Sequence, residues 1–211
     1  TAGYAQANLS LDNMLYLNLT GRAETASTYG DAKTFFYPSA ELGFQFSELL
    51  DNRETLSNGK LRLTYGRVGI EPAPYATQTY FVNASGGEGY GPAYDAGAYD
   101  GSFIRSSVQG NANLEPEKKT EYEAGVDLGF FNNRFTIGGT YYFNETEGAL
   151  FTVALPGSTG YSGRYSNAAS LENRGFELDF SLDILKSDDF AWNIYGNYST
   201  NENEVTSLEG T

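Results

Sequence analysis

Acids that stand two residues apart, such as Glu177 and Asp179, are the first side chains in this sequence whose spacing suggests chemistry. Two carboxyl groups on one strand face could serve as the acid and the base of a glycosidase. The chain contains no His and no Cys, which removes the usual general base and excludes thiolate zinc sites. Gly160-Tyr161-Ser162-Gly163 does not match a nucleophile elbow, and no ordinary Ser triad forms without His. The acids are better explained as a solvated wall, so we expect neither catalysis nor a cofactor.

A second group of interest lies in segment 69–118, which is rich in Tyr, Gly and Asp. Exposed tyrosines can stack on sugar rings or pack on a partner protein while their hydroxyls hydrogen-bond. The alternative is that Tyr and Gly only make a long loop compact. A Ca²⁺ site at Asp95 and Asp100 would lack the oxygen density of a calcium loop, so we expect no metal. The predicted ligand- or partner-binding residues are Tyr75, Tyr80, Tyr90, Tyr94, Asp95, Tyr99 and Asp100.

Charge and composition narrow the class of protein. Acidic residues number 27 against 13 basic ones, and the net charge of −14 argues against nucleic acid, whose phosphates demand a basic face. Aromatic residues make up 15% of the chain and Gly contributes 25 residues, which favours strands and Gly-rich loops over helices. No apolar run approaches the roughly 20 residues that a membrane-spanning helix needs.

The elements that position these residues are strands, because apolar and polar residues alternate with a period of two. Segment 174–184 is the clearest. One face carries Phe176, Leu178, Phe180, Leu182 and Ile184, and the other carries Gly175, Glu177, Asp179, Ser181 and Asp183. Eight strands are expected, around residues 4–11, 14–22, 37–47, 60–68, 119–130, 134–144 and 174–184 and from 190 onward.

The expected connections alternate in length, which is the layout of an up-and-down outer-membrane barrel with short turns at one end. Short or medium ones lie at Asp12-Asn13, 48–59, 131–133 and 186–189, and long ones at 23–34, 69–118 and 145–172. Nine residues from Phe176 to Ile184 span ~30 Å, and a tilt of ~40° projects this to ~23 Å. The apolar band of such barrels is about 25 Å tall, so the strand length agrees.

The same alternation suits a soluble β-sandwich whose apolar face points inward. Three features favour the membrane. Large aromatics flank smaller aliphatics, as Tyr122 and Phe130 do, and aromatic belts produce this arrangement. Long loops occur at one side only, which is uncommon in compact domains. Finally, Gly recurs on the polar face, where a plug could pack closely against it, at Gly43, Gly125, Gly129, Gly138 and Gly175.

Several motifs add a family resemblance. Asn113-Leu114-Glu115-Pro116-Glu117 followed by Glu121-Tyr122-Glu123-Ala124-Gly125 resembles a stretch of TonB-dependent outer-membrane receptors. Pro116 lacks an N–H and suits the point where a loop becomes a strand. Phe36-Tyr37-Pro38-Ser39, Leu61–Gly69, Glu172–Leu178 and Phe190–Asn193 narrow the resemblance to the SusC/RagA-like branch.

This resemblance implies energised import of oligosaccharides or peptides across the bacterial outer membrane, without covalent chemistry. It further implies a SusD-like lipoprotein as a lid, a TonB complex acting through a plug, contact with outer-membrane lipid, and a barrel of roughly 22 strands. Neither a plug nor a TonB box is recognisable in this sequence. We therefore expect residues 1–211 to form part of the C-terminal half of one barrel domain, with 69–118 as a long extracellular loop.

Two rival interpretations remain open. A small closed barrel of eight strands could act as an anchor or adhesin, with Tyr142 and Tyr195 helping to fill its narrow interior. This barrel requires the first and last strands to pair. The other rival is a soluble all-β carbohydrate-binding module, in which Leu178, Leu182 and Val126 would be packed beneath a second sheet.

Overall fold

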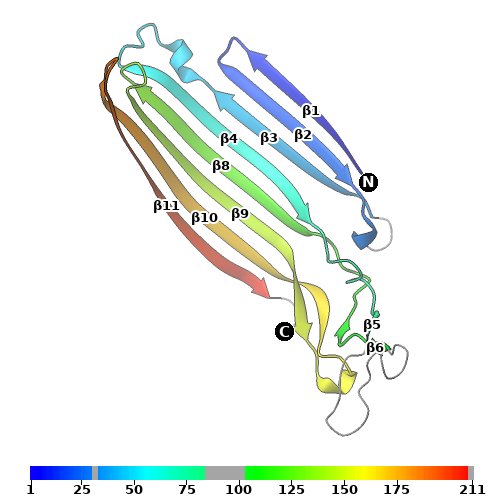
Figure 1. Ribbon diagram of the computed structural model, residues 1–211. Helices are drawn as coiled ribbons and strands as arrows, with labels where there is room; N and C mark the ends of the chain where they lie inside the picture. Colours follow the sequence, from blue (N-terminus) through cyan, green and yellow to red (C-terminus); the bar gives the residue numbers. More distant parts are fainter. Residues whose placement is uncertain (30–32, 84–102, 209–211) are drawn as a thin grey trace.

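The computed structural model describes residues 1–29, 33–83 and 103–208, and eight long antiparallel strands form one sheet (Figure 1). Each strand pairs with its neighbour along the sheet in the order β1-β2-β3-β4-β8-β9-β10-β11. This confirms the predicted all-β, up-and-down architecture. The strands are β1 Ala2–Leu11, β2 Leu15–Glu24, β3 Phe35–Phe44, β4 Leu56–Ile70, β8 Glu117–Phe130, β9 Phe135–Ala154, β10 Gly163–Lys186 and β11 Ala191–Leu208.

Short elements occupy the connections. Three 3₁₀ turns are η1 Ser27–Tyr29, η2 Phe46–Leu49 and η3 Gly157–Thr159. Between β4 and β8, β5 (Phe81–Asn83) pairs with β6 (Phe103–Arg105), and β7 (Val108–Gln109) runs parallel to the start of β10. Across the described ranges, no helix has the length and apolarity that crossing a membrane would require.

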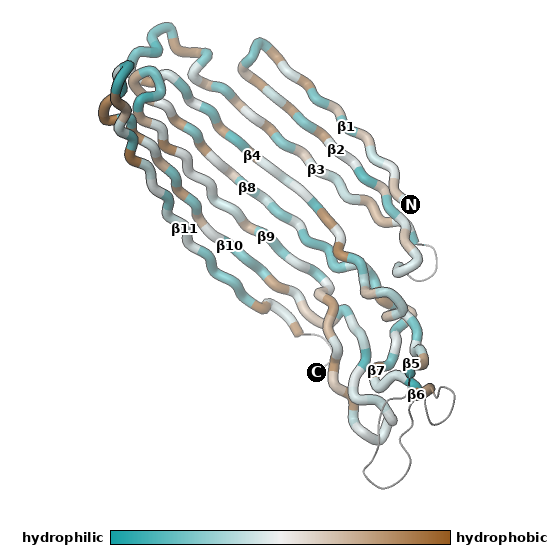
Figure 2. Tube along the Cα trace, viewed as in Figure 1, coloured by the Kyte–Doolittle hydropathy of each residue, from teal (hydrophilic) through white to brown (hydrophobic). Residues whose placement is uncertain are grey.

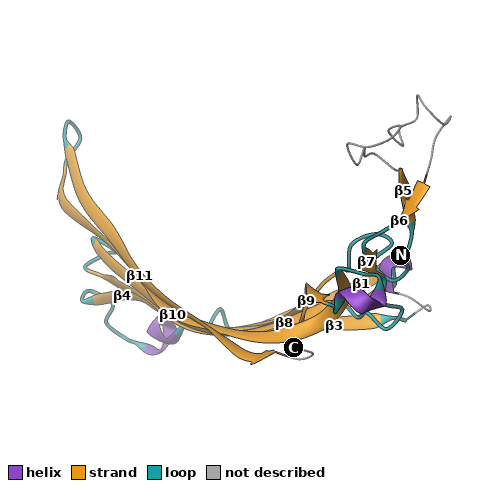
Figure 3. Cartoon of the chain, turned by 90° about the horizontal axis from the view of Figure 1, so that it is seen from below, coloured by secondary structure: helices purple, strands orange, loops and turns teal. Residues whose placement is uncertain are grey.

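The sheet is a single curved layer, and no second sheet of the described residues covers it (Figures 1 and 3). Few apolar side chains of the described residues are buried, and they belong mainly to the ends of strands and the longer connections. The buried apolar set is Tyr29, Tyr37, Ala76, Leu114, Ala149, Ala168 and Ala169. Backbone ladders therefore hold this structure together more than a hydrophobic core does.

The apolar strand face is open. Leu63 is 54% exposed, Tyr122 is 51% exposed and Leu182 is 37% exposed, although all three lie within long strands. Neither Leu178 nor Val126 is buried. Figure 2 shows hydrophobic and hydrophilic residues interleaved along the strands. The packing that a soluble sandwich requires is thus absent from the described part of the chain.

The closed eight-strand barrel is also wrong. Within the described residues, β1 pairs with β2 alone and β11 pairs with β10 alone, so the first and last strands are the two edges of an open sheet. Unpaired edges expose backbone N–H and C=O groups, which a lipid environment does not tolerate.

Tight turns join the strands at one end, as predicted. The β1–β2 connection is the three residues between Leu11 and Leu15, and both Asp12 and Asn13 have positive φ, of 50° and 55°, as tight hairpin turns often require. The β8–β9 turn uses three consecutive positive-φ residues, Phe131, Asn132 and Asn133. The medium connection between β3 and β4 contains η2, where Arg53 donates to Glu48 at 2.8 and 2.7 Å.

One predicted loop is wrong. Residues 145–172 are mostly strand, because β9 continues to Ala154 and β10 begins at Gly163. The alternation of apolar and polar residues disappears there because Glu145 and Glu147 occupy the strand face that is apolar between Phe135 and Phe143. Beyond the apolar band, both faces of a hairpin meet water. Its residues therefore need not alternate between apolar and polar, and the sequence pattern does not predict a strand.

The alternation of β10 also ends earlier than predicted. A β-bulge lies between Asp183, which pairs with Asn193, and Leu185, which pairs with Trp192. Ile184 is the extra residue, so the apolar face continues at Leu185. Arg134 donates to the backbone oxygens of Asp183 and Ile184 and thereby holds the bulge.

Candidate functional site

An ion pair on the polar face connects three strands. Arg62 of β4 donates to the two carboxylate oxygens of Asp127 in β8, at 2.8 and 3.1 Å, and to the Thr140 hydroxyl in β9 at 3.2 Å. Bidentate guanidinium–carboxylate pairs are geometrically specific, so this contact orients both side chains. The pair is partly exposed. Its two residues are 65 positions apart in the sequence, so no local sequence pattern could reveal the contact.

Glycines make room for this network. A Cβ on Gly125 would stand 2.9 Å from Arg62 Nη2, and one on Gly138 would stand 2.6 Å from Asp179 Oδ1. At Gly175 the Tyr142 hydroxyl occupies the same kind of space. The close packing expected above the polar-face glycines is therefore present, but neighbouring strands of this chain supply it. These glycines do not by themselves indicate a plug.

Further along the polar face, amide and hydroxyl groups cross-link β10 and β11. Asn193 donates to the Ser181 hydroxyl and to Asp183, each at 2.8 Å. The Tyr142 hydroxyl of β9 donates to Asn201 at 2.9 Å. The polar face thus presents a continuous hydrogen-bonding wall. The two acids that first suggested chemistry, Glu177 and Asp179, belong to this wall by strand alternation.

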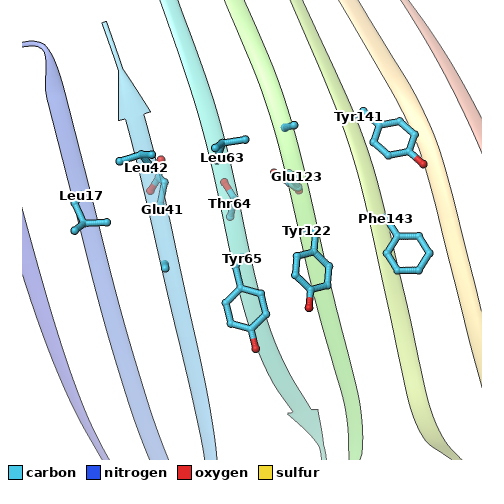
Figure 4. Close-up of a pocket in the computed structure, with 12 residues that line it drawn as sticks. Leu17, Glu41, Leu42, Leu63, Thr64, Tyr65, Tyr122, Glu123, Tyr141 and Phe143 are labelled. Carbon is cyan, nitrogen blue, oxygen red and sulfur yellow. The ribbon is translucent and has the colours of Figure 1, made fainter.

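The apolar face has an aromatic row near the end with the longer connections. Tyr65 and Tyr122 are paired across β4 and β8 with ring centroids 5.2 Å apart, and Phe143 follows on β9 (Figure 4). Together with leucines including Leu63, the row lines a shallow hollow of about 450 Å³. On the side of the row that faces the longer connections, Arg67 donates to Glu147 at 3.1 Å. The face changes from apolar to charged at the aromatic row, as an interfacial belt requires.

The segment leading into β8 is clamped by one side chain that the sequence analysis did not single out. Asn167 of β10 accepts from the Glu115 backbone N–H at 3.0 Å and donates to the oxygens of Glu115 and Gly148, each at 2.8 Å. Leu114 is fully buried beside it and Pro116 is nearly so. The motif that carried the family resemblance therefore forms the anchored C-terminal end of the β4–β8 connection, directly before β8 begins at Glu117.

Electrostatics strengthen this anchor. Glu115 accepts from Lys33 at 3.1 Å and from Lys118 at 3.2 Å. These two ammonium groups hold the pKa of the Glu115 carboxyl below its ordinary value. The β2–β3 connection and the β4–β8 connection are thereby joined through one carboxylate.

Of the predicted binding residues, only Tyr75 and Tyr80 lie in the part of the chain that the structure describes. Their ring centroids are 6.1 Å apart, and Tyr75 is 71% exposed. Tyr90, Tyr94, Asp95, Tyr99 and Asp100 lie outside the described residues. Their binding role stays a prediction.

An exposed apolar patch accompanies the two tyrosines. The β5–β6 pair presents Phe81 and Phe103 on one face and Ile104 on the other, and they are 68%, 69% and 58% exposed. Next to it, the Arg105 guanidinium stands 4.1 Å from the centre of the Tyr161 ring and donates to the Gly160 oxygen at 2.9 Å. The tip of the β9–β10 hairpin is thus fastened to the β4–β8 connection (Figure 1). Exposed apolar patches of this kind mark interaction surfaces.

Comparison with known proteins gives relatives that are much longer. The chain is 31% identical over 215 residues to the TonB-dependent receptor SusC of Bacteroides thetaiotaomicron, covering 98% of this chain and 21% of SusC. It is 27% identical to a TonB-dependent receptor of Formosa agariphila, covering 98% of this chain and 20% of that protein. The chain therefore spans about a fifth of the length of the curated relatives it matches.

Solved structures share the fold. The RagAB peptide transporter superposes with a TM-score of 0.83 at 23% identity, over 99% of this chain and 22% of the transporter chain. The siderophore receptor PirA from Pseudomonas aeruginosa reaches 0.62 at 18% identity, over 97% of this chain and 34% of PirA. At these identities the likeness concerns the fold alone.

The family profile "TonB dependent receptor-like, beta-barrel" matches residues 1–211, which is the whole chain. This match confirms the resemblance that the motifs suggested. Receptors of this family are transporters and not enzymes, in agreement with the interpretation of the paired acids as a wall. The chain belongs to the TonB-dependent receptor β-barrel family and forms part of a barrel of the bacterial outer membrane.

Proposed function

We propose that this chain is the wall of an energy-coupled importer that moves oligosaccharides or peptides across the outer membrane. Its apolar face meets lipid, its polar face lines the lumen, and the connection 71–116 stands on the extracellular side. A SusD-like lipoprotein covers the opening, and a TonB complex supplies energy through the rest of the protein.

The observation that carries the proposal is the sidedness of the sheet. Leucines such as Leu63 are exposed on one face, while the Arg62–Asp127–Thr140 network occupies the other. Burying a bidentate ion pair in lipid would be costly, whereas an exposed leucine costs nothing there. A lumen is the environment that suits the polar face.

Partner binding is supported by the patch at β5–β6 and by the adjoining Tyr75. The β5–β6 pair lies beyond the aromatic row and therefore outside the lipid. Exposure of its three large apolar side chains to water is unfavourable. Aromatic anchors are also enriched at protein interfaces. A lid that packs on this patch would bury it.

The test uses the full-length protein in its own bacterium. A deletion strain should lose uptake of the limiting oligosaccharide or peptide, and complementation should restore it. Uptake should also stop when the proton gradient is dissipated, because import is energised. Unchanged uptake in the deletion strain would refute the import function. Uptake that continues after the proton gradient is dissipated would refute the energy coupling.

A second experiment addresses the lid. Phe103→Asp and Ile104→Asp place charges on the two faces of the β5–β6 pair and leave the eight-strand sheet unchanged, so the barrel should fold while co-purification of the lipoprotein falls. Lys60→Asp on the polar face is the matched control, since it changes charge far from the patch. Equal recovery of the lipoprotein with all three variants would contradict the assignment of the patch.

A further inference from the structure

The β9–β10 hairpin reaches far beyond the aromatic row. It continues from Phe143 in that row to Ala154, which is ~36 Å along a strand (Figure 1). Cross-strand pairing is maintained as far as Gly163↔Ala154 at the end of the hairpin. A ladder of backbone hydrogen bonds therefore rises from the barrel wall to the level of the β5–β6 patch.

The patch itself has little structure of its own. β5 and β6 share three residue pairs, from Phe81↔Arg105 to Asn83↔Phe103. Two-stranded ribbons are at best marginally stable in water when they stand alone. The exposed apolar side chains of the patch therefore need support from a neighbouring element to hold one arrangement.

Arg105 connects the patch directly to the tip of the hairpin. Its guanidinium lies 4.1 Å from the centre of the Tyr161 ring and donates to the Gly160 oxygen at 2.9 Å. Gly160 has a φ of 74°, and a Cβ there would stand 3.1 Å from Arg105 Nη2, so glycine suits both the backbone and the contact. Arg105 alternates with Ile104 along β6 and shares a face with Phe103. One side chain thus joins the exposed ribbon to the hairpin.

The return limb of the connection, residues 103–116, is bonded to the hairpin at further points. The Ser162 N–H donates to the Ser107 oxygen at 2.8 Å. The Asn111 amide donates to the Tyr165 oxygen at 3.0 Å. Between these contacts, β7 runs parallel to the start of β10. The hairpin therefore carries the return limb over most of its length.

The outgoing limb, residues 71–83, lies on the return limb. The Ser106 N–H donates to the Tyr80 oxygen at 2.9 Å. A Cβ on Gly110 would collide with the backbone of Gln78, so the two limbs approach closely at this glycine. The order of support is hairpin, return limb and outgoing limb, and the patch is the end of that series.

We propose that the β9–β10 hairpin supports the docking patch and that Arg105 positions the patch for its partner. This inference rests on the proposed docking of a SusD-like lipoprotein. Binding orders less of the protein when the patch is already fixed, and only the fixed fraction of molecules is competent to bind. Loss of the Arg105 contact therefore weakens docking without any contact between Arg105 and the lipoprotein.

The experiment uses the full-length protein in detergent and the SusD-like lipoprotein that co-purifies with it. Arg105→Ala removes the contact with the hairpin tip. Asn111→Ala removes a contact of the same limb at a position away from the patch. Arg53→Ala is the matched control, because Arg53 donates to Glu48 at 2.8 and 2.7 Å at the opposite end of the sheet. Affinity is measured by interferometry, and hydrogen exchange of residues 103–111 is measured without the lipoprotein.

A disulfide separates positioning from direct contact. Ser107 and Ser162 directly precede the paired residues Val108 and Gly163. Neighbouring strands lie about 4.8 Å apart, which is within the Cα separations that disulfides span. Residues 1–211 contain no Cys, so Ser107→Cys with Ser162→Cys introduces one defined pair. Oxidation should fix the return limb on the hairpin, and reduction should release it in the same protein.

Arg105→Ala should speed hydrogen exchange of residues 103–111 about two- to fivefold, the value of an exposed cation–π contact. Asn111→Ala should also speed it, and Arg53→Ala should leave it unchanged. The Arg105→Ala/Asn111→Ala protein should bind the lipoprotein about threefold more weakly or worse. With the cysteine pair added and oxidised, this protein should regain the affinity of the unaltered one, and reduction should weaken binding again.

Three results would overturn the inference. They are unaltered hydrogen exchange in Arg105→Ala, weak binding that persists after oxidation, and failure of the cysteine pair to cross-link. Persistent weak binding would mean that Arg105 contacts the lipoprotein itself. The proposed docking fails in a different way. If the lipoprotein does not bind the unaltered protein, or binds Phe103→Asp equally well, the patch is not the docking surface, whatever the exchange rates of the return limb.

Discussion

Replacing Leu63 by Arg tests which face of the sheet meets lipid. Leu63 is 54% exposed and pairs with Leu42 on one side and Ala124 on the other. In water, substituting so exposed a residue changes stability by no more than about 0.5 kcal/mol. In a bilayer, Arg on the lipid face of a barrel costs about 2–4 kcal/mol at the midplane and about 0–1 kcal/mol near the interfaces. Leu63 lies between the aromatic row and the midplane, so we expect a cost of about 1–3 kcal/mol. The two environments therefore predict clearly different results.

The neighbouring residue supplies the matched control. Thr64 occupies the opposite face and pairs with Glu41 on β3 and Glu123 on β8. Thr64→Arg therefore places a cation between two carboxylates. The electrostatic gain at a solvated wall is small, about 0–1 kcal/mol, so this variant should be neutral or slightly stabilised.

The assay is reversible folding of the full-length protein from urea into lipid vesicles, with tryptophan fluorescence and heat-modifiable mobility as readouts. Leu63→Arg should lower the unfolding free energy by about 1–3 kcal/mol, while Thr64→Arg should leave it unchanged or raise it by up to about 1 kcal/mol. If Thr64→Arg were the damaging variant and Leu63→Arg were tolerated, the assignment of faces would be reversed. The barrel-wall argument would be refuted with it.

Four further outcomes are expected. Asp127→Ala should cost about 1 kcal/mol in the same folding assay, because it strips a partly exposed guanidinium of its carboxylate, whereas Asp127→Asn should recover part of the loss. Asn167→Ala removes three hydrogen bonds from the anchor, so residues 103–116 should become more sensitive to limited proteolysis while the sheet is retained. The pKa of the Glu115 carboxyl is lowered, so its ion pairs with Lys33 and Lys118 stabilise the anchor above pH 4.5, the ordinary pKa, and this stabilisation is lost as the pH falls through the lowered pKa. Hydrogen exchange at the anchor should therefore rise over that pH range. Lys33→Ala should make this rise smaller. Deleting 72–110 in the full-length protein should leave a heat-modifiable barrel but impair capture of substrate or lid; normal growth on the limiting nutrient would contradict this.

The sequence by itself determined the strands of the apolar band and their sidedness. Successive side chains of a strand point to opposite faces, so a segment such as 174–184 reveals both its conformation and its two surfaces. The tight turn at Asp12-Asn13 is equally local, because these residue types tolerate positive φ. Composition excluded catalysis by His or Cys without any structure.

Local patterns failed where both faces of a strand meet water. The hairpin that carries Glu145 and Glu147 has no apolar side, so its sequence is not distinguishable from a loop. The bulge at Ile184 was missed for a related reason, since one inserted residue changes the pairing register without changing the local composition.

Only the tertiary structure decided what crosses from strand to strand. Arg62 and Asp127 meet because the β4–β8 register places them diagonally opposite each other, although 65 residues separate them. Asn167 reaches Glu115 across 52 residues, and the β3–β4 ladder stops at Ser39↔Gly66 although both strands continue. Strand alternation follows from the geometry of one residue and its neighbours. Register, seams and anchors depend on the pairing of distant segments, which no local pattern encodes.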